Sequence, residues 1–333
     1  MADTAIRTPP VLPRPLYRAE APPRRTIWTR RRLIALAGAY AVALGGMIAL
    51  KGLFISADRY FLILLVPALV LGLGRPYVRD FLPFVAAILL YENLRGVAHS
   101  LRPEPFYMPM IDVDRFLGFG HVPSVVLQDW LWTGSVQWYD QVLAVVARAH
   151  FFVPPTLLFL IWLERRELFY RAVVALVGVS LVGALVFLVF PAAPPWRASE
   201  VGLLPDLVKI GTAQAAASPV DATRSFISNM ELPNPYAAVP SLHTAYSLLT
   251  FVFAFTWRRR IGWAFLAYPL VMWFTIVYFA DHYVADIIVG AAMALAAWWA
   301  AGRLVRPGGR LGRLAGPFPS PLASARTFGG PKP

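Results

Sequence analysis

Two short segments of the sequence place histidine where it can act on a phosphate group. The first is PSLH at 240–243, and the second is DHYVAD at 281–286. His282 and Asp286 are four residues apart, so on a helix they would share one face. A carboxylate there can hold the imidazole in one tautomer, which leaves the other ring nitrogen free to attack phosphorus. His243 could then protonate the leaving alkoxide and later deprotonate an acceptor.

The PSLH segment also predicts a seat for the phosphate. Pro240 is suited to the first turn of a helix, where its missing N–H is no loss. The backbone N–H groups that follow, together with the positive end of the helix dipole, favour an anion. Ser241 adds a hydroxyl donor. A single histidine at a helix end is more often a capping or interfacial residue than a catalyst, but two such motifs on one side of the membrane favour catalysis.

The elements that must position these motifs are membrane helices. The chain of 333 residues is 58% hydrophobic and 15% charged, whereas a soluble domain is about half apolar and a quarter charged. Its net charge of +13 comes from arginines in short clusters between apolar runs. This pattern sets membrane orientation and gives no support to nucleic-acid binding. The absence of cysteine excludes disulfides and thiol chemistry.

We therefore expect an all-α polytopic membrane protein, a bundle of about eight transmembrane helices. The candidate crossings are 33–53, 57–74, 80–100, 137–163, 168–190, 241–257, 261–280 and 283–302. The second is the weakest, because its clean apolar run is short and contains Pro67. Without it the later topology would be inverted.

Charge selects the orientation. With the N-terminus inside, the cytoplasmic segments hold more than twice as many Lys and Arg residues as the outer ones. This bias predicts cytoplasmic termini and histidine motifs at the extracytoplasmic face of the cell (plasma) membrane. Residues 1–23 and 307–333 are expected to be a disordered leader and tail around one membrane-embedded catalytic domain, 24–306.

Two long loops are expected outside the membrane, at 101–136 and 191–239. The aromatic-rich stretch VPSVVLQDWLWTGSVQWY, which begins in the first loop, predicts either an interfacial helix or a simple aromatic belt. No internal repeat is visible, so an inverted-repeat transporter is disfavoured.

Taken together, these motifs resemble the type 2 phosphatidic acid phosphatase (PAP2) superfamily, whose pattern runs K-x6-R-P, then P-S-G-H, then S-R-x5-H-x3-D. The closer resemblance is to its Aur1-type inositol phosphorylceramide synthase branch, where PSLH, HHY-x2-D and A-P-P-W segments occur. This chain has PSLH, PAAPPWR at 191–197 and DHYVAD. The matched region runs from about Glu92 to Gly290.

The resemblance implies a six-helix core with extra N-terminal helices, and an enzyme without metal or other cofactor. It implies a covalent phosphohistidine on His282, with Asp286 orienting it and His243 as acid and then base. The expected partners are a phospholipid donor and a lipid or polyol acceptor, or water. No protein partner is inferred. Hydrolysis of a lipid phosphate monoester is the alternative activity within the superfamily.

The chain departs from the family pattern in its cationic residues. The arginine expected six positions before His282 is Ile276, Thr275 takes the place of the serine before it, and Lys-x6-Arg-Pro is absent. Fewer cationic groups suit a phosphodiester with one negative charge better than a monoester with nearly two. This favours headgroup transfer or cleavage over phosphatidate hydrolysis.

Other residues are candidates for binding phosphate or substrate. They are Ser241, Arg197, Arg95, Arg224 and Tyr283. Arg95 can also serve only to neutralise Glu92, and Arg224 only as a solvated charge. We expect Asp140, Arg148 and His150, in the fourth crossing, to serve helix packing or a supporting role rather than to contact the substrate.

Two rival functions remain. Asp112-Val113-Asp114 is a D-x-D pattern, which in a polytopic glycosyltransferase could hold a metal-bound phosphosugar. Charges inside the membrane segments, such as Glu92 and Arg148, are the feature that a lipid transporter without covalent chemistry would need.

Overall fold

The computed structural model describes residues 30–51, 57–101, 104–217 and 236–306. In these ranges the chain is built of helices, and the expected all-α fold is confirmed there. Isolated bridges join Phe106 to Ala192 and Ala192 to Ala237. The expected leader, the expected tail and Arg224 lie outside the described residues.

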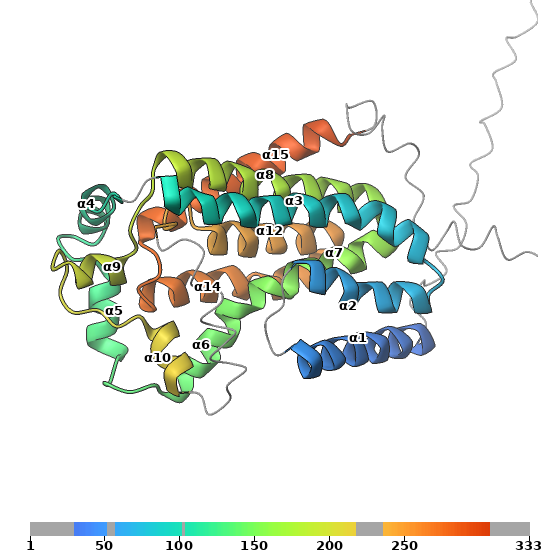
Figure 1. Cartoon of the computed structure of the whole chain (residues 1–333), viewed down its shortest axis with the longest axis horizontal. Coiled ribbons are helices and arrows are strands. Elements are labelled where there is room, and N and C mark those ends of the chain that lie inside the picture. Colours follow the sequence, from blue (N-terminus) through green and yellow to red (C-terminus); the bar gives the residue numbers. More distant parts are fainter. Residues whose placement is uncertain (1–29, 52–56, 102–103, 218–235, 307–333) are drawn as a thin grey trace, which may run out of the picture.

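The helices follow the expected apolar runs closely (Figure 1). The first three are α1 (Arg30–Lys51), α2 (Ala57–Val70) and α3 (Gly74–Leu101), and the loop that follows carries α4 (Met108–Leu117) and α5 (Pro123–Leu131). Next come α6 (Trp138–Arg148), the 3-10 turn η1 (Ala149–Phe151), α7 (Val153–Glu164) and α8 (Arg166–Val189). The remainder are α9 (Pro195–Glu200), α10 (Ile210–Ala217), α12 (Leu242–Trp257), α13 (Arg259–Phe265), α14 (Ala267–Tyr278) and α15 (Val284–Leu304).

Helix α12 lies at the centre of the bundle. It packs against α7, α8, α13, α14 and α15, and its residues Ala245, Leu249 and Phe253 have no exposed surface. Helix α2 packs against α3 and α7, and α1 packs against α2 (Figure 1). The helix that begins with the PSLH segment is therefore the one that most of the core surrounds.

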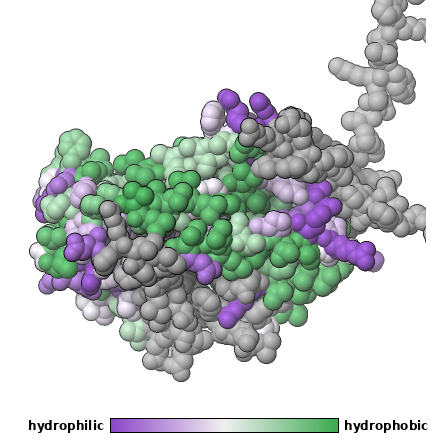
Figure 2. Space-filling view, turned by 45° about the horizontal axis from the view of Figure 1, so that its top comes forward, coloured by the Kyte–Doolittle hydropathy of each residue, from purple (hydrophilic) through white to green (hydrophobic). Residues whose placement is uncertain are grey.

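The outer surface of the bundle is apolar. Large hydrophobic side chains such as Leu82, Leu185 and Leu295 are more than half exposed. Figure 2 shows such side chains covering most of the middle of one face, with hydrophilic residues gathered towards its two ends. A band of this kind matches the hydrocarbon region of a bilayer.

The expected number of eight crossings is not confirmed. Among the described residues, α8, the α13–α14 pair (Arg259–Tyr278) and α15 are long and apolar enough to span, and the bent α6–α7 pair makes a fourth. Helices α2 and α12 are apolar but shorter than a usual span. Helix α12 begins only after Ser241 caps it, one residue later than expected.

The fourth expected crossing is one bent element. Its two halves meet at 46° across η1. Pro154 and Pro155 explain the break, because a proline ring clashes with the carbonyl four residues earlier and supplies no N–H for the helix. These carbonyls belong to His150 and Phe151, so His150 lies at the bend itself.

The expected interfacial helix is shorter than its aromatic stretch. Helix α5 ends at Leu131, and Gly134 takes a positive φ of 88° before α6 begins. Trp130 and Trp138 are about three-quarters exposed at 77% and 76%. Their exposure fits aromatic side chains at a membrane interface.

The two ends of the bundle differ in chemistry. At one end Arg165 donates to the Thr256 carbonyl (2.9 Å) and Arg258 pairs with Glu164 (2.6 Å). The small helices α4, α5, α9 and α10 gather at the opposite end (Figure 1). The arginine clusters at 165–166 and 258–260 thus share one end, as the topology required.

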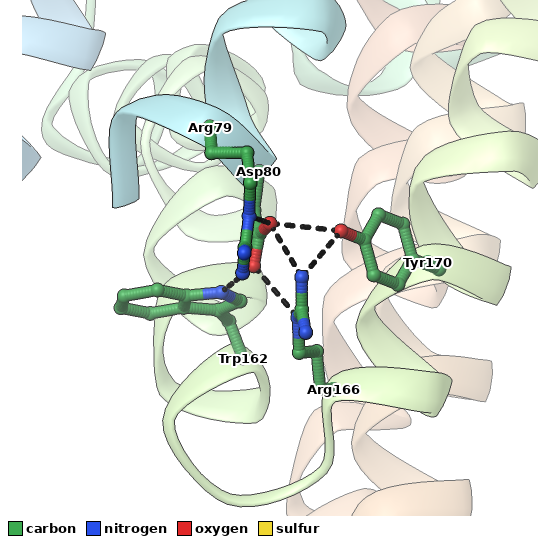
Figure 3. Close-up of polar contacts among 5 residues, drawn as sticks. All are labelled: Arg79, Asp80, Trp162, Arg166 and Tyr170. Carbon is green, nitrogen blue, oxygen red and sulfur yellow. Dashed lines mark hydrogen bonds and ion pairs between the residues drawn. The ribbon is translucent and has the colours of Figure 1, made fainter. Parts of the chain in front are cut away.

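A buried ion pair locks this arginine-rich end (Figure 3). Arg166 of α8 donates to both carboxylate oxygens of Asp80 on α3, at 2.8 and 2.7 Å. Trp162 of α7 donates to Oδ2 (2.8 Å) and the Tyr170 hydroxyl to Oδ1 (2.8 Å). Arg166, one of the cationic residues at this end, is only 8% exposed.

Replacing Asp80 with alanine should destabilise the bundle strongly. The change leaves a buried guanidinium without its carboxylate, which costs about 3–5 kcal/mol. Arg79→Ala is the matched control, because Arg79 contacts the same carboxylate but its side chain is 64% exposed, so its loss should cost at most about 1 kcal/mol. Thermal unfolding in mild detergent measures both. Equal stabilities of the two variants would contradict the structural role given to Asp80.

Candidate active site

The two expected histidines meet at the end of the bundle opposite the arginine clusters. The Nδ1 atom of His243 lies 3.2 Å from Nε2 of His282, and the ring centroids are 5.3 Å apart. His282 is 5% exposed. Residues 39 positions apart in sequence therefore form one contact, as the sequence predicted.

The surroundings of His282 fix its tautomer. Its Nδ1 lies 2.9 Å from the Ala238 carbonyl and 3.3 Å from the Asp286 carboxylate. Both are acceptors, so Nδ1 must carry the proton. Nε2 then bears the lone pair and accepts from Nδ1–H of His243. The ring nitrogen suited to nucleophilic attack is thus the one that faces the second histidine.

His282 and Asp286 reach each other without sharing a helix face. Helix α15 begins at Val284, and His282 lies in the turn before it. The N–H groups of Asp281 and His282 donate to the Ile276 carbonyl (3.0 and 3.1 Å), and Tyr283 N–H donates to Asp286 (2.9 Å). The carboxylate therefore binds the turn as well as the imidazole.

Helix α12 starts one residue later than expected. Ser241, not Pro240, adjoins the first turn, and its Oγ accepts from Thr244 N–H (3.3 Å). Ser241 N–H lies 3.3 Å from the Asp286 carbonyl, which ties α12 to α15. Ser241 therefore caps a helix, a role that its serine type explains.

Gly290 allows the two helices to come this close. A Cβ at this position would lie 2.4 Å from the Ser241 carbonyl oxygen and 3.2 Å from Cβ of Thr244. Any side chain would force α15 away from α12. The contact between His243 and His282 depends on this missing atom.

The proline-rich segment 191–196 holds both histidine-bearing segments. Ala238 N–H donates to the Ala192 carbonyl (3.2 Å), and Trp196 N–H donates to the Ala280 carbonyl (3.1 Å). Ala238 in turn accepts from His282. The segment thus fixes the loop before α12 and the turn before α15 to one frame.

Asp114, which the sequence showed only as part of a D-x-D pattern, has a supporting role. Its carboxylate accepts from the backbone N–H groups of Val284 (3.1 Å) and Ala285 (2.9 Å), so a residue of α4 caps α15. Its surface is fully buried. Burial raises the pKa of the Asp114 carboxyl to about 6, while the two backbone donors oppose this shift.

His150 is the second residue whose place was not foreseen. Its ring centroid lies 4.5 Å from that of His243, in an edge-on arrangement. Its Nδ1 lies 2.6 Å from the Ala147 carbonyl, so Nδ1 is the protonated nitrogen and Nε2 is an acceptor. The pair of prolines that bends α6–α7 was the available signal in the sequence.

The remaining candidates fall into different places. Arg95 lines one cavity with His150 and His243. Arg197 pairs with Glu200 on α9 and also interacts with Tyr236. The Tyr283 ring is fully buried beside Ile111, Ala198 and Leu204. Phosphate or substrate binding by these residues and by Ser241 stays a prediction.

The D-x-D pattern is not one site. Asp112 is exposed on α4, whereas Asp114 is buried and caps α15. Across the part of the chain that the structure describes, no three His, Cys, Asp or Glu side chains converge as metal ligands. Asp140 accepts from Gln137 N–H and from the Tyr278 hydroxyl (2.7 and 2.9 Å), which packs α6 on α14.

Comparison with known proteins identifies relatives. Residues 109–300 match the family described as the PAP2 superfamily. The chain is 31% identical over 156 residues to a phosphoinositol dihydroceramide synthase of Bacteroides thetaiotaomicron, which covers 44% of this chain and 50% of that protein. It is 26% identical over 142 residues to the inositol phosphorylceramide synthase catalytic subunit of Schizosaccharomyces pombe, covering 40% of this chain and 33% of that protein.

These findings confirm the resemblance inferred from the histidine motifs. The matched part of the chain spans half or less of the length of these relatives. No solved structure gives a significant match.

Asp114 should give the protein a pH-dependent stability in the acid range. A carboxyl whose pKa rises on folding binds its proton more tightly in the folded state. The contribution of Asp114 to the free energy of unfolding is therefore largest below about pH 4 and is lost as the pH rises to about 6, by on the order of 1.4 kcal/mol per pKa unit. Asp114→Asn should remove this fall. Unfolding followed from pH 4 to 7 measures it.

Asp112→Asn is the control for this experiment, because Asp112 lies exposed on the same helix. It should keep the wild-type pH dependence. If Asp114→Asn and Asp112→Asn show the same profile, Asp114 does not titrate as its burial requires.

Proposed function

The chain belongs to the PAP2 superfamily, and on that premise we propose that it is an integral-membrane lipid phosphotransferase. In this proposal it transfers a phosphoryl group or a phospho-headgroup, such as phosphoinositol, from a phospholipid to a lipid or polyol hydroxyl. The curated relatives named above are synthases of inositol-containing sphingolipids, which supports a headgroup transferase. The observation that carries the proposal is the 3.2 Å contact between Nε2 of His282 and His243, while Nδ1 of His282 lies 2.9 Å from the Ala238 carbonyl.

The first half of the reaction forms a phosphohistidine. Nε2 of His282 attacks phosphorus, and the bond from phosphorus to the lipid oxygen breaks. His243, as imidazolium, gives a ring proton to the leaving alkoxide. The new phosphoimidazolium keeps its proton on Nδ1, where the Ala238 carbonyl and Asp286 stabilise it. The chain supplies nucleophile, acid and counter-charge from three side chains.

The second half reverses these steps with a new alcohol. Neutral His243 takes the proton of the acceptor hydroxyl, whose oxygen attacks phosphorus, and the phosphorus–Nε2 bond breaks. With water in place of the alcohol the same steps give hydrolysis. The cationic positions favour a phosphodiester donor, because Ile276 is buried at the place of the family arginine and Arg197 is paired with Glu200.

The proposal includes an orientation. We assign the arginine-rich end to the cytoplasm, by the excess of positive charge there, and the histidine site to the extracytoplasmic face of the plasma membrane. The buried Asp80–Arg166 pair and the Arg258–Glu164 pair lie at the first end. Both described termini, Arg30 and Arg306, then lie at the cytoplasmic side.

A labelled donor should leave its phosphorus on His282. Incubation with phospholipids carrying labelled phosphorus, followed by rapid denaturation in base, should recover an acid-labile phosphoramidate on the peptide that contains residue 282. His282→Ala should abolish it, and activity should fall by roughly 10³-fold or more, since the nucleophile is lost. His243→Ala should slow both formation and turnover. Label on another residue, or transfer without label, would refute the covalent route.

Transfer should not depend on Asp112 or on a divalent cation. Asp112 is exposed and has no part in the proposed mechanism, so Asp112→Ala should keep near-wild-type activity. A chelator should not abolish transfer. Headgroup transfer measured with and without chelator tests this. A divalent requirement together with an inactive Asp112→Ala and an active His282→Ala would favour the glycosyltransferase. Transport without any phosphoramidate would favour the transporter.

A further inference from the structure

A cavity opens beside His243 and extends away from His282. It is lined by α2, α3, the η1–α7 bend, α8 and α12. His243 and His150 contribute to its wall, whereas His282 does not. We call it the α3 pocket, because Tyr77, Phe81, Val85, Ile88, Glu92 and Arg95 of α3 form one of its sides. A molecule in this pocket meets the acid–base histidine and not the nucleophile.

The α3 pocket is long and narrow. Its residues on α3 recur at helical spacing, so they form one continuous face, and from Tyr77 to Arg95 the helix rises about 27 Å. One leaflet of the hydrocarbon core is about 15 Å deep, half of roughly 30 Å. The cavity volume is about 190 Å³, below the 300 Å³ or more typical of pockets for drug-sized ligands. This shape suits one unbranched chain.

The two ends of the α3 pocket differ in polarity. The distant part is walled by Tyr77, Phe81 and Leu64, side chains that are almost completely buried. The near end holds His243, with His150 edge-on to it and the charged residues Glu92 and Arg95 along the same wall. A ligand that matches both ends is an amphiphile with a polar group at His243 and a hydrocarbon chain along α3.

The direction of the chemistry identifies that polar group. In an in-line displacement the group that leaves and the group that enters both lie opposite the nucleophile. With Nε2 of His282 on one side of phosphorus, the lipid oxygen that leaves and the acceptor oxygen that enters occupy the same side, next to His243. The same wall therefore has to accommodate both alcohols in turn.

We infer that the α3 pocket binds the hydrocarbon chain of a lipid alcohol, with its hydroxyl at His243, and that it holds the leaving alcohol of the donor and the acceptor alcohol one after the other. This inference rests on the proposed function for the direction of transfer. In the first half-reaction the alcohol leaves with the proton of His243. In the second, the incoming alcohol returns that proton to His243 as its oxygen bonds to phosphorus.

A photoactivatable long-chain alcohol, with a diazirine at the far end of its chain, tests the pocket without turnover. In lipid nanodiscs the label should map to Tyr77 and Phe81, the apolar end of the pocket. Excess diacylglycerol should compete with it, and so should an unlabelled long-chain alcohol, whereas the matching alkane should not. Labelling confined to lipid-facing residues such as Leu82 and Leu90, unaffected by competitors, would overturn the inference.

Val85→Phe narrows the middle of the pocket and is the informative variant. It should lower specific labelling by about tenfold, the effect of excluding roughly two methylenes from an apolar site. It should also raise the KM for the donor and the KM for the acceptor, because the pocket receives the alcohols of both. Leu82→Phe is the matched control, since Leu82 lies on the same helix, is 51% exposed and is absent from the pocket wall. It should change none of these quantities.

The outcomes separate the two proposals. Specific labelling that Val85→Phe reduces, in a protein that transfers no headgroup, would support the pocket and refute the function. Normal headgroup transfer with unchanged labelling and acceptor KM in Val85→Phe would refute the pocket and leave the function standing. Thermal unfolding of both phenylalanine variants checks that each is folded.

Discussion

The hydrogen bond from His282 to the Ala238 carbonyl is the contact on which the site depends. A carbonyl can only accept, so it fixes the proton on Nδ1 and leaves the lone pair on Nε2, the nitrogen that we propose as the nucleophile. Asp286 adds negative charge at the same nitrogen. Because Ala238 belongs to the loop before α12 and His282 to the turn before α15, the two segments have to be held together. Three contacts hold these two segments together: the bridge at Ala192, the cap by Asp114 and the close contact at Gly290.

Buried polar groups elsewhere follow the same physical rule. In an apolar bundle an unpaired polar atom costs several kcal/mol, so each buried charge is bound by several donors or acceptors. Asp80 receives five hydrogen bonds from four residues and joins α3, α7 and α8. Gln128 bonds to the backbone of Val208 and Tyr278 and joins α5 to α14. These contacts make the bundle a firm support for the histidines.

The sequence predicted the features that depend on apolar runs or on residues close together along the chain. Apolar runs located the helices to within a few residues, and the spacing in DHYVAD paired His282 with Asp286. Contacts between distant segments left no such pattern. Asp114 lies 170 residues from its partner Val284 and appeared only as half of a D-x-D motif. His150 lies beside His243 because of the bend between α6 and α7. The two prolines predict that bend but not its direction. The position of Pro240 outside α12 depended on which residue would cap the helix, and Ser241 does so.

Gly290 shows how little separates an assembled site from a dispersed one. The residue takes no part in the chemistry and lies one turn beyond Asp286, yet the carbonyl of Ser241 occupies the space that a side chain would need. A single methyl group there would work as a wedge between α12 and α15, and would widen the gap that the two imidazoles now share. Such a protein would keep both histidines and Asp286, insert in the membrane and fold, and still lack activity. The assembly of the site thus requires that residue 290 has no Cβ atom.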